Sequence, residues 1–585
     1  ASDVYKRQDF NDLAELIFPD AKDVSYYEEK YPERNLKEGA MVTRFAPSPT
    51  GFIHIGGLFG SIIDRKLAEQ SEGVFILRIE DTDQKREIEN GVEQIVNGLK
   101  DFGITPDEGV ISETEEIGNY GPYKQSERKE IYEAYAKSLV KQGLAYPCFC
   151  TPEELDEIRA KQEAAKIKPG YYGVWAKYRT LPVEQAVEKI KNGEKYIIRF
   201  KSMGREDRRI KHKDSIKGNI EFPENDQDIV IIKADGLPTY HFAHAVDDHL
   251  MRVTQVIRGD EWVSSLPLHL ELFRALGFKP PKYAHTATIM KDENGSKRKI
   301  SKRKDPEAAV SYYHEEGIPA DAVVEYLLNI ANSTFEPWRR ANPNKPVEEF
   351  DLQLNKMSVS GAVFDMVKLL DVSKNVISKY TAEKIYEETL KWAEKYNQEF
   401  AKLLKENKDY SIKVLNIERG KAKPRKDIAK WSDVENTIEY MYNDIFENMN
   451  DYEFQKINDE AEIKDILNSY IEKHFNISDD KETWFNKMKD LAEEKGYARE
   501  VKEYKANPEA YKGHVGDIST VIRVALTTRH NTPDLYEIMQ VLGKEEVEKR
   551  IQDFIGEIGI YLKEKINGIQ NWRHSRIKKT TSVWK

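Results

Sequence analysis

One short segment combines a histidine with glycines in a pattern suited to binding phosphate. Within residues 44–57 (RFAPSPTGFIHIGG), two prolines and Gly51 predict a turn after a strand, and Gly56 and Gly57 predict the start of a helix. The free N–H groups of that helix would face the turn, where an anionic phosphate is the natural ligand. An N–H of His54 could donate to phosphate oxygens as charge builds up in a transition state. A lone histidine is more often structural, but this turn favours the catalytic interpretation.

A second segment, far downstream, is strongly basic. Residues 297–304 read KRKISKRK. Taken alone, such a run is usually a solvated face or an RNA contact. Together with the first motif, it indicates a mobile basic loop that closes on a triphosphate, with positive charge from Lys299 and Lys302.

The elements that position the first motif follow from the hydrophobic pattern. The sequence predicts a strand at 41–46, a turn at 47–51, a helix at 55–70 and a second strand at 74–79. This spacing is typical of a βαβ unit, which implies a parallel sheet in an α/β domain.

Beyond this unit the pattern changes. After Tyr123 it is helical and rich in Lys, with short β-like runs at 196–200 and 229–232, as expected of an insertion. Strand-like sequence returns at 253–258, followed by an amphipathic helix at 264–276.

The C-terminal half is expected to be helical, because no strand pattern is convincing after about Pro306. Apolar residues at helical spacing predict stacked helical domains. The helical segments are 321–331, 384–404, 460–474 and 533–555. The basic segment 421–426 (KAKPRK) is either a linker or a contact loop.

Composition limits the classes of function. The chain has 585 residues, too many for one compact core, and 39% hydrophobic residues, enough for packed domains. Its net charge of −11 argues against indiscriminate binding to polyanions, so any nucleic-acid contact must use local basic patches. No apolar run is long enough for a membrane span or an export signal. Residues 1–8 lack a periodic pattern and are interpreted as an assembly scar.

The two cysteines, Cys148 and Cys150, exclude a disulfide framework and fit a reducing, cytoplasmic compartment. Two thiols cannot complete a four-ligand zinc site by themselves.

The two phosphate motifs resemble the "HIGH" and "KMSKS" signatures of class I aminoacyl-tRNA synthetases, written here as HIGG and KISKR. The lead-in RFAPSPTG resembles bacterial-type glutamyl-tRNA synthetases. Further segments similar to that family are Leu77–Asp83 (LRIEDTD), Gly236–His241 (GLPTYH), Val246–His249 (VDDH), Val256–Trp262 (VIRGDEW), Leu354–Lys356 (LNK), Ala362–Asp365 (AVFD) and Arg523–Thr527 (RVALT), with Gly543 closing the last stretch. The resemblance covers about residues 41–555.

The resemblance implies a glutamate pocket. Arg44 and Arg258 would face the side-chain carboxylate, because guanidinium groups match planar carboxylates at two points. Glu80 would hold the substrate ammonium. The implied glutamate-binding residues are Arg44, Ala46 (through its backbone), Ser48, Glu80, Tyr240 and Arg258. Without the family, Glu80 would be interpreted as a surface acid and Tyr240 as a core aromatic.

The resemblance also implies an ATP site and its chemistry. The implied ATP-binding residues are His54, Gly56, Gly57, Trp262, Lys299, Ser301, Lys302 and Arg303, of which His54, Lys299 and Lys302 are the implied catalytic residues. Trp262 could equally be a packing residue. The glutamate α-carboxylate would attack the α-phosphate of ATP, which carries Mg²⁺, and release pyrophosphate. A terminal ribose hydroxyl of tRNA, the 2′ in class I enzymes, would then take the glutamyl group.

The expected fold is α/β: a Rossmann-like class I synthetase catalytic domain with an α+β insertion, followed by all-α stem-contact and anticodon-binding domains. The expected divisions are 1–40 (N-terminal extension), 41–124 with 241–295 (catalytic domain), 125–240 (acceptor-end connective insertion), 296–388 (KISKR loop and stem-contact helices), and 389–480 and 481–585 (two helical anticodon-binding domains). The expected partners are tRNA(Glu), L-glutamate and ATP, with no membrane, and the protein is expected to be a cytoplasmic monomer.

The sequence departs from the family in some places. Many relatives carry zinc ligands in the insertion. Here Cys148 and Cys150 are present, but Tyr171, Tyr172 and Trp175 stand where further cysteine or histidine ligands would be expected. No structural zinc and no protein-held metal are therefore expected. His244 occupies a position near the substrate carboxylate that is Asn or apolar in relatives, which leaves its role open. Residues 1–40, the segment 386–495, and discrimination against tRNA(Gln) also stay open.

Three other functions agree less well with the sequence. A glutaminyl-tRNA synthetase shares the fold and phosphate motifs, but the RFAPSPTG lead-in and the helical C-terminal half count against it. A small nucleotidyltransferase has no use for the long helical half. A non-catalytic tRNA-binding paralogue would be expected to lose His54 or Lys302, and both are present.

Overall fold

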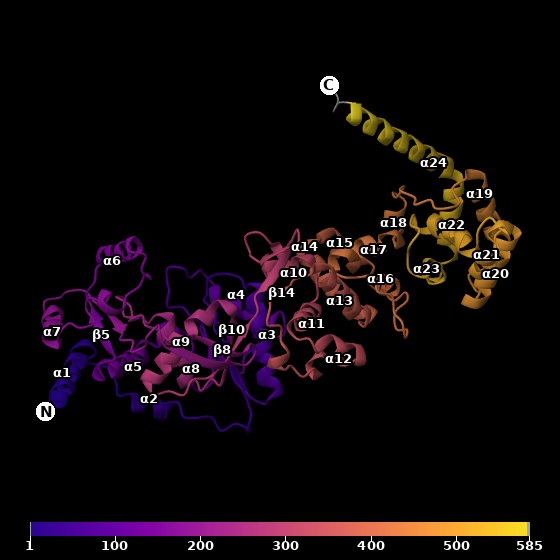
Figure 1. Ribbon diagram of the computed structural model, residues 1–585. Helices are drawn as coiled ribbons and strands as arrows, with labels where there is room; N and C mark the ends of the chain where they lie inside the picture. The colour runs from indigo at the N-terminus through magenta and orange to yellow at the C-terminus, as the bar shows by residue number, and fades with distance from the viewer. Residues whose placement is uncertain (1, 582–585) are drawn as a thin grey trace. The chain divides into compact units, whose positions relative to one another are not determined.

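The computed structural model describes residues 2–581, and the chain divides into two compact units. The first unit takes in the chain as far as Tyr313 together with Ala320–Leu369. The second takes in His314–Pro319 and the chain from Leu370 onward. Figure 1 draws the first unit in indigo and magenta and most of the second in orange and yellow. Among the described residues, no helix combines the length and apolar character needed to cross a bilayer.

The predicted βαβ unit is confirmed. Strands β1 (Val42–Phe45) and β2 (Val74–Leu77) pair in parallel, with Arg44 opposite Ile76, and α3 (Ile55–Gln70) connects them. The α3 stripe that includes Leu58, Ile62 and Ile63 is buried, as its helical spacing predicts. The second strand ends two residues earlier than expected.

The sheet continues beyond β2, and a separate two-stranded sheet lies beside β1. β3 (Glu108–Val110) pairs in parallel with β2, β4 (Glu116–Ile117) pairs antiparallel with β3, and α4 (Gly91–Lys100) precedes them. β10 (Gln255–Gly259) and β11 (Lys282–Thr286) form a parallel pair. The backbone N–H of Thr254 donates to the carbonyl of Val42 (3.0 Å), which aligns the starts of β1 and β10. The carboxyl ends of these two strands therefore lie at the same edge.

The N-terminal segment is helical. Its helices are α1 (Ser2–Ile17) and α2 (Val24–Lys30). Residues 2–8, interpreted from the sequence as an assembly scar, form the first part of α1 and continue without a break into its second half.

The insertion mixes helices with antiparallel strands, as expected of an α+β domain. Its sheet has the order β5-β6-β9, and β7 and β8 form a separate hairpin. The elements are α5 (Lys129–Lys141), β5 (Ala145–Cys148), α6 (Pro152–Ala164), α7 (Val183–Lys191), β6 (Ile197–Phe200), β7 (Arg209–Asp214), β8 (Gly218–Pro223) and β9 (Val230–Ile232).

The rest of the first unit corrects two expectations. The basic segment 297–304 is not wholly a loop, because its first part belongs to β13, which pairs antiparallel with β12. A short strand also follows Pro306, since β14 pairs in parallel with β12. The elements are α8 (Tyr240–Leu250), α9 (Leu266–Leu276), β12 (Ile289–Glu293), β13 (Ser296–Lys299), α10 (Ser311–Glu316), α11 (Ala320–Ala331), α12 (Phe335–Ala341), β14 (Ala362–Val363) and α13 (Met366–Ser378), of which α10 and α13 run into the second unit.

The second unit is helical, as predicted, but three expected helices are interrupted. The helix expected at 384–404 breaks at Asn397, whose side chain caps the following helix. The one expected at 460–474 ends in a π-helical turn from Tyr470 to His474, and the one at 533–555 breaks at Gly543. The helices are α14 (Ala382–Tyr396), α15 (Gln398–Glu406), α16 (Lys408–Leu415), α17 (Val434–Ile438), α18 (Asn443–Phe446), α19 (Glu460–Ser469), α20 (Lys481–Glu494), α21 (Val501–Ala506), α22 (Val515–Thr527), α23 (Leu535–Leu542) and α24 (Lys544–Thr581).

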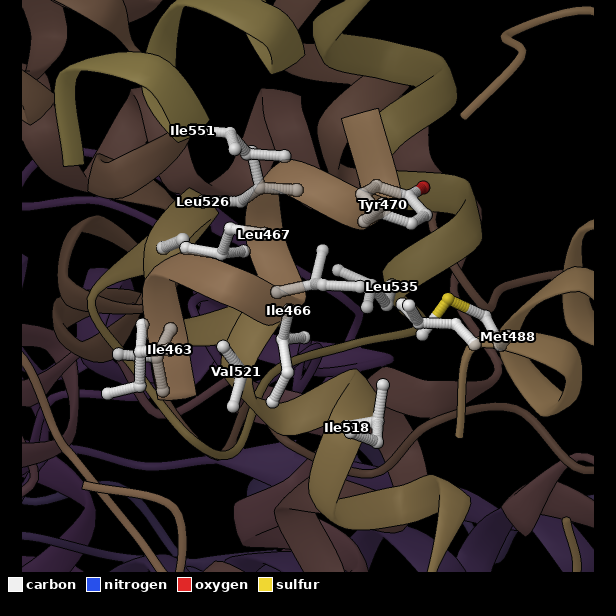
Figure 2. Packing of buried hydrophobic residues seen from close by; sticks show 14 of the residues in the cluster. Ile463, Ile466, Leu467, Tyr470, Met488, Ile518, Val521, Leu526, Leu535 and Ile551 are labelled. Carbon is white, nitrogen blue, oxygen red and sulfur yellow. The ribbon is translucent and has the colours of Figure 1, made fainter. Parts of the chain in front are cut away.

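Two hydrophobic clusters stabilise this unit. One gathers residues from Ile377 to Phe446 together with Ile538. The other gathers residues between Tyr452 and Ile558, and Figure 2 shows Ile466, Leu467 and Leu535 packed at its centre. The basic segment 421–426 is a contact loop within this unit, because Arg425 donates to the carbonyl of Thr532 (2.9 Å).

Candidate active site

A cavity of about 750 Å³ opens at the carboxyl ends of β1 and β10, where parallel α/β sheets commonly bind ligands. Most of the residues singled out from the sequence line it. They are Arg44, Ala46, Ser48, His54, Gly56, Gly57, Glu80, Tyr240, Arg258, Trp262 and Lys299. Ser301, Lys302 and Arg303 are not among its lining residues.

His54 is the N-cap of α3, and this position fixes where its proton lies. The backbone N–H of Gly56 donates to His54 Nδ1 (2.9 Å). Because Nδ1 accepts, the neutral ring carries its proton on Nε2. Burial, followed by the charges of Lys302 and Lys299, lowers the pKa of His54 below its usual value. The ring is therefore a neutral donor beside the free N–H groups of the helix.

The cap itself is not specific to the cavity. His514 caps α22 in the same way, with the Gly516 N–H donating to its Nδ1 (3.0 Å). His514 does not line the cavity. A histidine two residues before a glycine is thus a local folding signal. What distinguishes His54 is its position beside Arg44, Arg258 and Lys299.

The basic segment is anchored at one residue. Asp305 accepts two hydrogen bonds from Arg298 (both 2.7 Å) and one from the Ser301 N–H (3.0 Å). Lys302 Nζ donates to the carbonyl of Phe52, in the turn before His54. The structure therefore brings Lys302 close to the His54 segment, although Lys302 does not line the cavity.

Arg44 forms a two-point ion pair with a buried carboxylate. Its Nε lies 3.1 Å from Asp248 Oδ1 and its Nη2 lies 3.1 Å from Asp248 Oδ2. Arg78 Nη1 also donates to Asp248 Oδ1 (2.7 Å). The two guanidinium groups hold the pKa of Asp248 well below its usual value, against the opposing effect of burial.

A second buried carboxylate extends this network. Asp247 accepts from Arg128 Nε (2.7 Å) and from the Tyr132 hydroxyl (2.7 Å). Its Oδ2 lies 3.9 Å from Arg78 Nε, and Arg78 Nη2 lies 3.6 Å from Glu80 Oε1. Arg44, Arg78 and Arg128 thus face three carboxyl groups, those of Asp247, Asp248 and Glu80.

Glu80 is the weakly held member of this set. Its Oε1 is buried and accepts no hydrogen bond from the described residues. Burial raises its pKa to about 7, although Arg78 and Arg44 act in the opposite direction. A cationic group bound in the cavity would supply a hydrogen-bond donor to this oxygen.

Arg258 contrasts with Arg44. Its Nε donates to His285 Nε2 (3.0 Å), its Nη1 lies 2.8 Å from His269 Nδ1, and its Cζ lies 4.6 Å from the centre of the Tyr283 ring. Its Nη2 is buried without a hydrogen bond to any described residue. No carboxylate of the described residues forms an ion pair with it.

Aromatic rings form one wall of the cavity. Tyr240 packs on Trp262, with ring centroids 4.5 Å apart. His244 is fully buried and does not line the cavity. Its Nδ1 lies 2.7 Å from Asp248 Oδ2, and its Nε2 lies 2.9 Å from the Tyr283 hydroxyl. The open role of His244 is therefore answered in part: it supports the carboxylate that pairs with Arg44.

Both cysteines contact the hydroxyl group of a tyrosine. Cys148 Sγ lies 3.4 Å from the Tyr171 hydroxyl, and Cys150 Sγ lies 3.8 Å from the same oxygen. Among the described residues, no group of three or more His, Cys, Asp or Glu could hold a metal ion.

Several residues of the site were not found from the sequence. Asp248 belongs to the segment VDDH, which resembles the family but gave no role for this carboxylate. The other missed residues are Asp214, His269, Tyr283 and His285. No sequence signal connects them to Arg258, because they are spread over several elements of the chain.

Comparisons with known proteins agree with this architecture. The family described as "tRNA synthetases class I (E and Q), catalytic domain" matches residues 40–371, and "Anticodon binding domain" matches residues 384–555. The chain is 53% identical over 549 residues to a glutamate–tRNA ligase of Clostridium perfringens (strain SM101), covering 93% of this chain and 99% of that protein. It is 52% identical over 546 residues to one of Acetivibrio thermocellus, covering 93% and 99%. A crystal structure of a glutamate tRNA ligase from Elizabethkingia meningosepticum in complex with its amino acid superimposes with a TM-score of 0.69 and 29% identity, covering 88% and 99%.

Proposed function

The chain belongs to the family of class I tRNA synthetases for glutamate and glutamine, and from this premise we propose how its cavity works as the active site of a glutamate–tRNA ligase. The protein activates L-glutamate with ATP and transfers the glutamyl group to tRNA. The proposal concerns which residues do this work.

The glutamate pocket lies at the carboxyl end of β10. Arg258, which has no carboxylate partner among the described residues, binds the side-chain carboxylate together with Arg44. Glu80 accepts from the substrate ammonium, which explains its unsatisfied buried oxygen. Tyr240, Ser48 and the Ala46 backbone complete the polar wall.

The ATP site lies at the mouth of α3. Neutral His54 donates through Nε2 to the phosphate oxygens, and the N–H groups near Gly56 and Gly57 face the same anion. Trp262 lies against the nucleotide. Lys299, Lys302, Ser301 and Arg303 surround the departing pyrophosphate, so Lys302 must leave the Phe52 carbonyl to reach the phosphates.

Mg²⁺ fits this site as an ion carried by the triphosphate. The cavity lining includes the cationic side chains of Arg44, Arg86, Arg258 and Lys299, which suit a triphosphate. Mg²⁺ is commonly held by substrate phosphates and water in such sites. When bound, it would neutralise phosphate charge while His54 and Lys299 orient the phosphates.

The reaction then has two balanced steps. The glutamate α-carboxylate oxygen attacks the α-phosphorus of ATP, and pyrophosphate leaves. A terminal ribose hydroxyl of tRNA, the 2′ in class I enzymes, attacks the acyl carbon of the resulting glutamyl-adenylate. The bond from that carbon to the phosphate oxygen breaks, AMP leaves, and the hydroxyl proton is released with it. The second unit contains the region matched as an anticodon-binding domain, so it binds the anticodon end of tRNA(Glu).

The remaining assignments follow from this role. The insertion at 125–240 binds the acceptor end, the residues from 296 to 388 contact the stem, and 389–480 and 481–585 are two anticodon-binding domains. The protein works in the cytoplasm, where tRNA is charged, as a monomer without structural zinc.

The observation that carries the proposal is that one cavity joins the His54 helix mouth to a buried guanidinium without a counter-ion among the described residues. ATP–pyrophosphate exchange tests it, with glutamate or glutamine as substrate and with or without tRNA. Exchange supported by glutamate and not by glutamine is expected. Equal exchange with both amino acids would contradict the assignment.

A further inference from the structure

The two arginines of the glutamate pocket differ in how their charge is balanced. Arg44 forms a two-point ion pair with Asp248. Among the described residues, Arg258 has no carboxylate within 4 Å, and its two hydrogen bonds go to His285 and His269. Both arginines are more than nine-tenths buried. Different exposure to solvent therefore does not explain why, among the described residues, Arg44 has a carboxylate partner and Arg258 has none.

The hydrogen-bond pattern defines the protons of these histidines. A guanidinium can only donate, so His285 Nε2 and His269 Nδ1 both accept. The remaining proton of His285 lies on Nδ1, which donates to Asp214 Oδ2 (2.5 Å). The remaining proton of His269 lies on Nε2, which is 2.8 Å from His241 Nδ1. Each ring is thus neutral and held in one tautomer.

The surroundings favour the neutral form. Burial lowers the pKa of His269 well below its usual value, and the nearby His244 and Arg258 side chains act in the same direction. Burial also lowers the pKa of His285, although Asp214 opposes it. The carboxylate of Asp214 reaches Arg258 only through the His285 ring. No carboxylate of the described residues therefore neutralises the positive charge of Arg258 by direct contact.

We propose that His269, His285 and Asp214 are positioning residues that set the preference for glutamate, because they hold Arg258 with neutral acceptors and leave its charge for the substrate carboxylate. This inference rests on the proposed glutamate-binding function of the cavity. Glutamate would supply the missing anion and reach the unpartnered Nη2. Glutamine has the same shape but would leave the buried cation without a counter-ion, which is costly.

The test replaces a neutral acceptor with a charged one at the same position. His269→Glu places a carboxylate beside Arg258, whereas His269→Gln offers an acceptor of the same size without charge. The pair His269→Asp and His269→Asn repeats the comparison with shorter side chains. Each full-length variant is assayed by tRNA-supported ATP–pyrophosphate exchange with glutamate and with glutamine.

The expected result separates charge from packing. His269→Gln should keep the glutamate-to-glutamine ratio of kcat/KM within about tenfold, whereas His269→Glu should lower it by about 100-fold or more, through KM for glutamate and not KM for ATP. The shorter pair should show the same order. Equal ratios in the charged and amide variants would overturn the inference.

Thermal melting gives a second readout that does not need activity. Burying a carboxylate usually destabilises a protein, but here it would neutralise a buried cation. The Tm of each carboxylate variant should therefore equal or exceed that of its amide partner. A lower Tm in both carboxylate variants would overturn the inference. Failure of the unmodified enzyme to use glutamate would instead contradict the proposed function.

Discussion

Arg44 on β1 and Asp248 on α8 form a two-point buried ion pair, with both nitrogen–oxygen distances 3.1 Å. The two residues are far apart in sequence, and their pairing joins β1 to α8, the helix whose first residue, Tyr240, lines the cavity. Arg78 shares the same carboxylate (2.7 Å). Replacing Asp248 with a neutral residue would leave the buried guanidinium groups of Arg44 and Arg78 without this counter-ion.

Asp248→Asn should therefore lower the free energy of unfolding by about 3–5 kcal/mol, the usual cost of breaking a buried pair. Chemical denaturation of the purified protein measures it. Asp83→Asn is the matched control, because the Arg86–Asp83 pair lies on the surface (3.2 Å) and should contribute no more than about 1 kcal/mol. Equal effects of the two substitutions would show that the buried network does not stabilise the fold.

Lys302→Ala should slow adenylate formation by about 10²–10³, the usual effect of removing one donor that stabilises developing charge. Its affinity for tRNA should change little. ATP–pyrophosphate exchange and tRNA binding measure the two quantities. Lys304→Ala, in the same basic segment, is the control and should leave exchange nearly intact. Loss of tRNA affinity with normal exchange would return the segment to the role of an RNA contact.

The proposed contact between Glu80 and the substrate ammonium implies that glutamate binding depends on pH. Its pKa of about 7 means that the carboxyl group is protonated below that pH, and only the carboxylate binds the substrate ammonium. KM for glutamate should rise as pH falls from about 8 to about 6, while KM for ATP stays constant. Glu80→Gln should give a high KM without pH dependence. An unchanged pH profile in this variant would exclude Glu80 as the titrating group.

The same proton affects stability with a definite sign. Between the ordinary pKa of a glutamate and about 7, folded Glu80 holds a proton that the unfolded chain has lost. The unfolded state binds fewer protons in this window, so stability should fall as pH rises through it. Denaturation of the wild type and of Glu80→Gln at several pH values provides the comparison.

Purified protein should contain no stoichiometric zinc, because Cys148 and Cys150 contact Tyr171 and lack further ligands among the described residues. Elemental analysis measures the metal content. Treatment with a zinc chelator, followed by excess Mg²⁺, should leave exchange activity unchanged. One zinc per chain, lost together with activity, would contradict the prediction.

Arg258→Ala should weaken glutamate use by about 2–5 kcal/mol in kcat/KM, the range for one partner of a buried charge pair, with little effect on ATP. Arg258→Lys should restore only part of it, because an ammonium cannot donate at two points to a carboxylate. Steady-state charging measures both variants. A large rise in KM for ATP with Arg258→Ala would place this arginine in the nucleotide site instead.

Local sequence patterns predicted the bounds of helices and strands better than they predicted which segments pair with one another. The bounds of α3 were predicted at both ends, because a proline-containing turn and two glycines mark its start and its apolar residues keep helical spacing to Gln70. The break at Asn397 was missed because apolar spacing continues across it, while the Asn side chain caps a new helix. Segment 297–299 was expected in a loop because lysine and arginine do not alternate with apolar residues, yet pairing with β12 makes it a strand.

The candidate site shows the same division. Residues within the motifs, such as His54 and Glu80, were named from the sequence and line the cavity. The partners of Arg44 and Arg258 were not named from the sequence. Asp248, His269 and His285 lie on α8, α9 and β11, and the sequence does not show that these elements meet at the cavity. Sequence spacing cannot say which of two adjacent aspartates reaches which arginine.

The hydrogen bond from Gly56 to His54 has a thermal consequence. The bond that begins α3 also holds the imidazole in one orientation, so opening of the first helical turn would release the ring from its place beside the cavity. Helix ends open locally at free energies well below that of global unfolding. Fraying of a single turn would therefore displace the His54 ring while the sheet and the rest of the cavity remain folded.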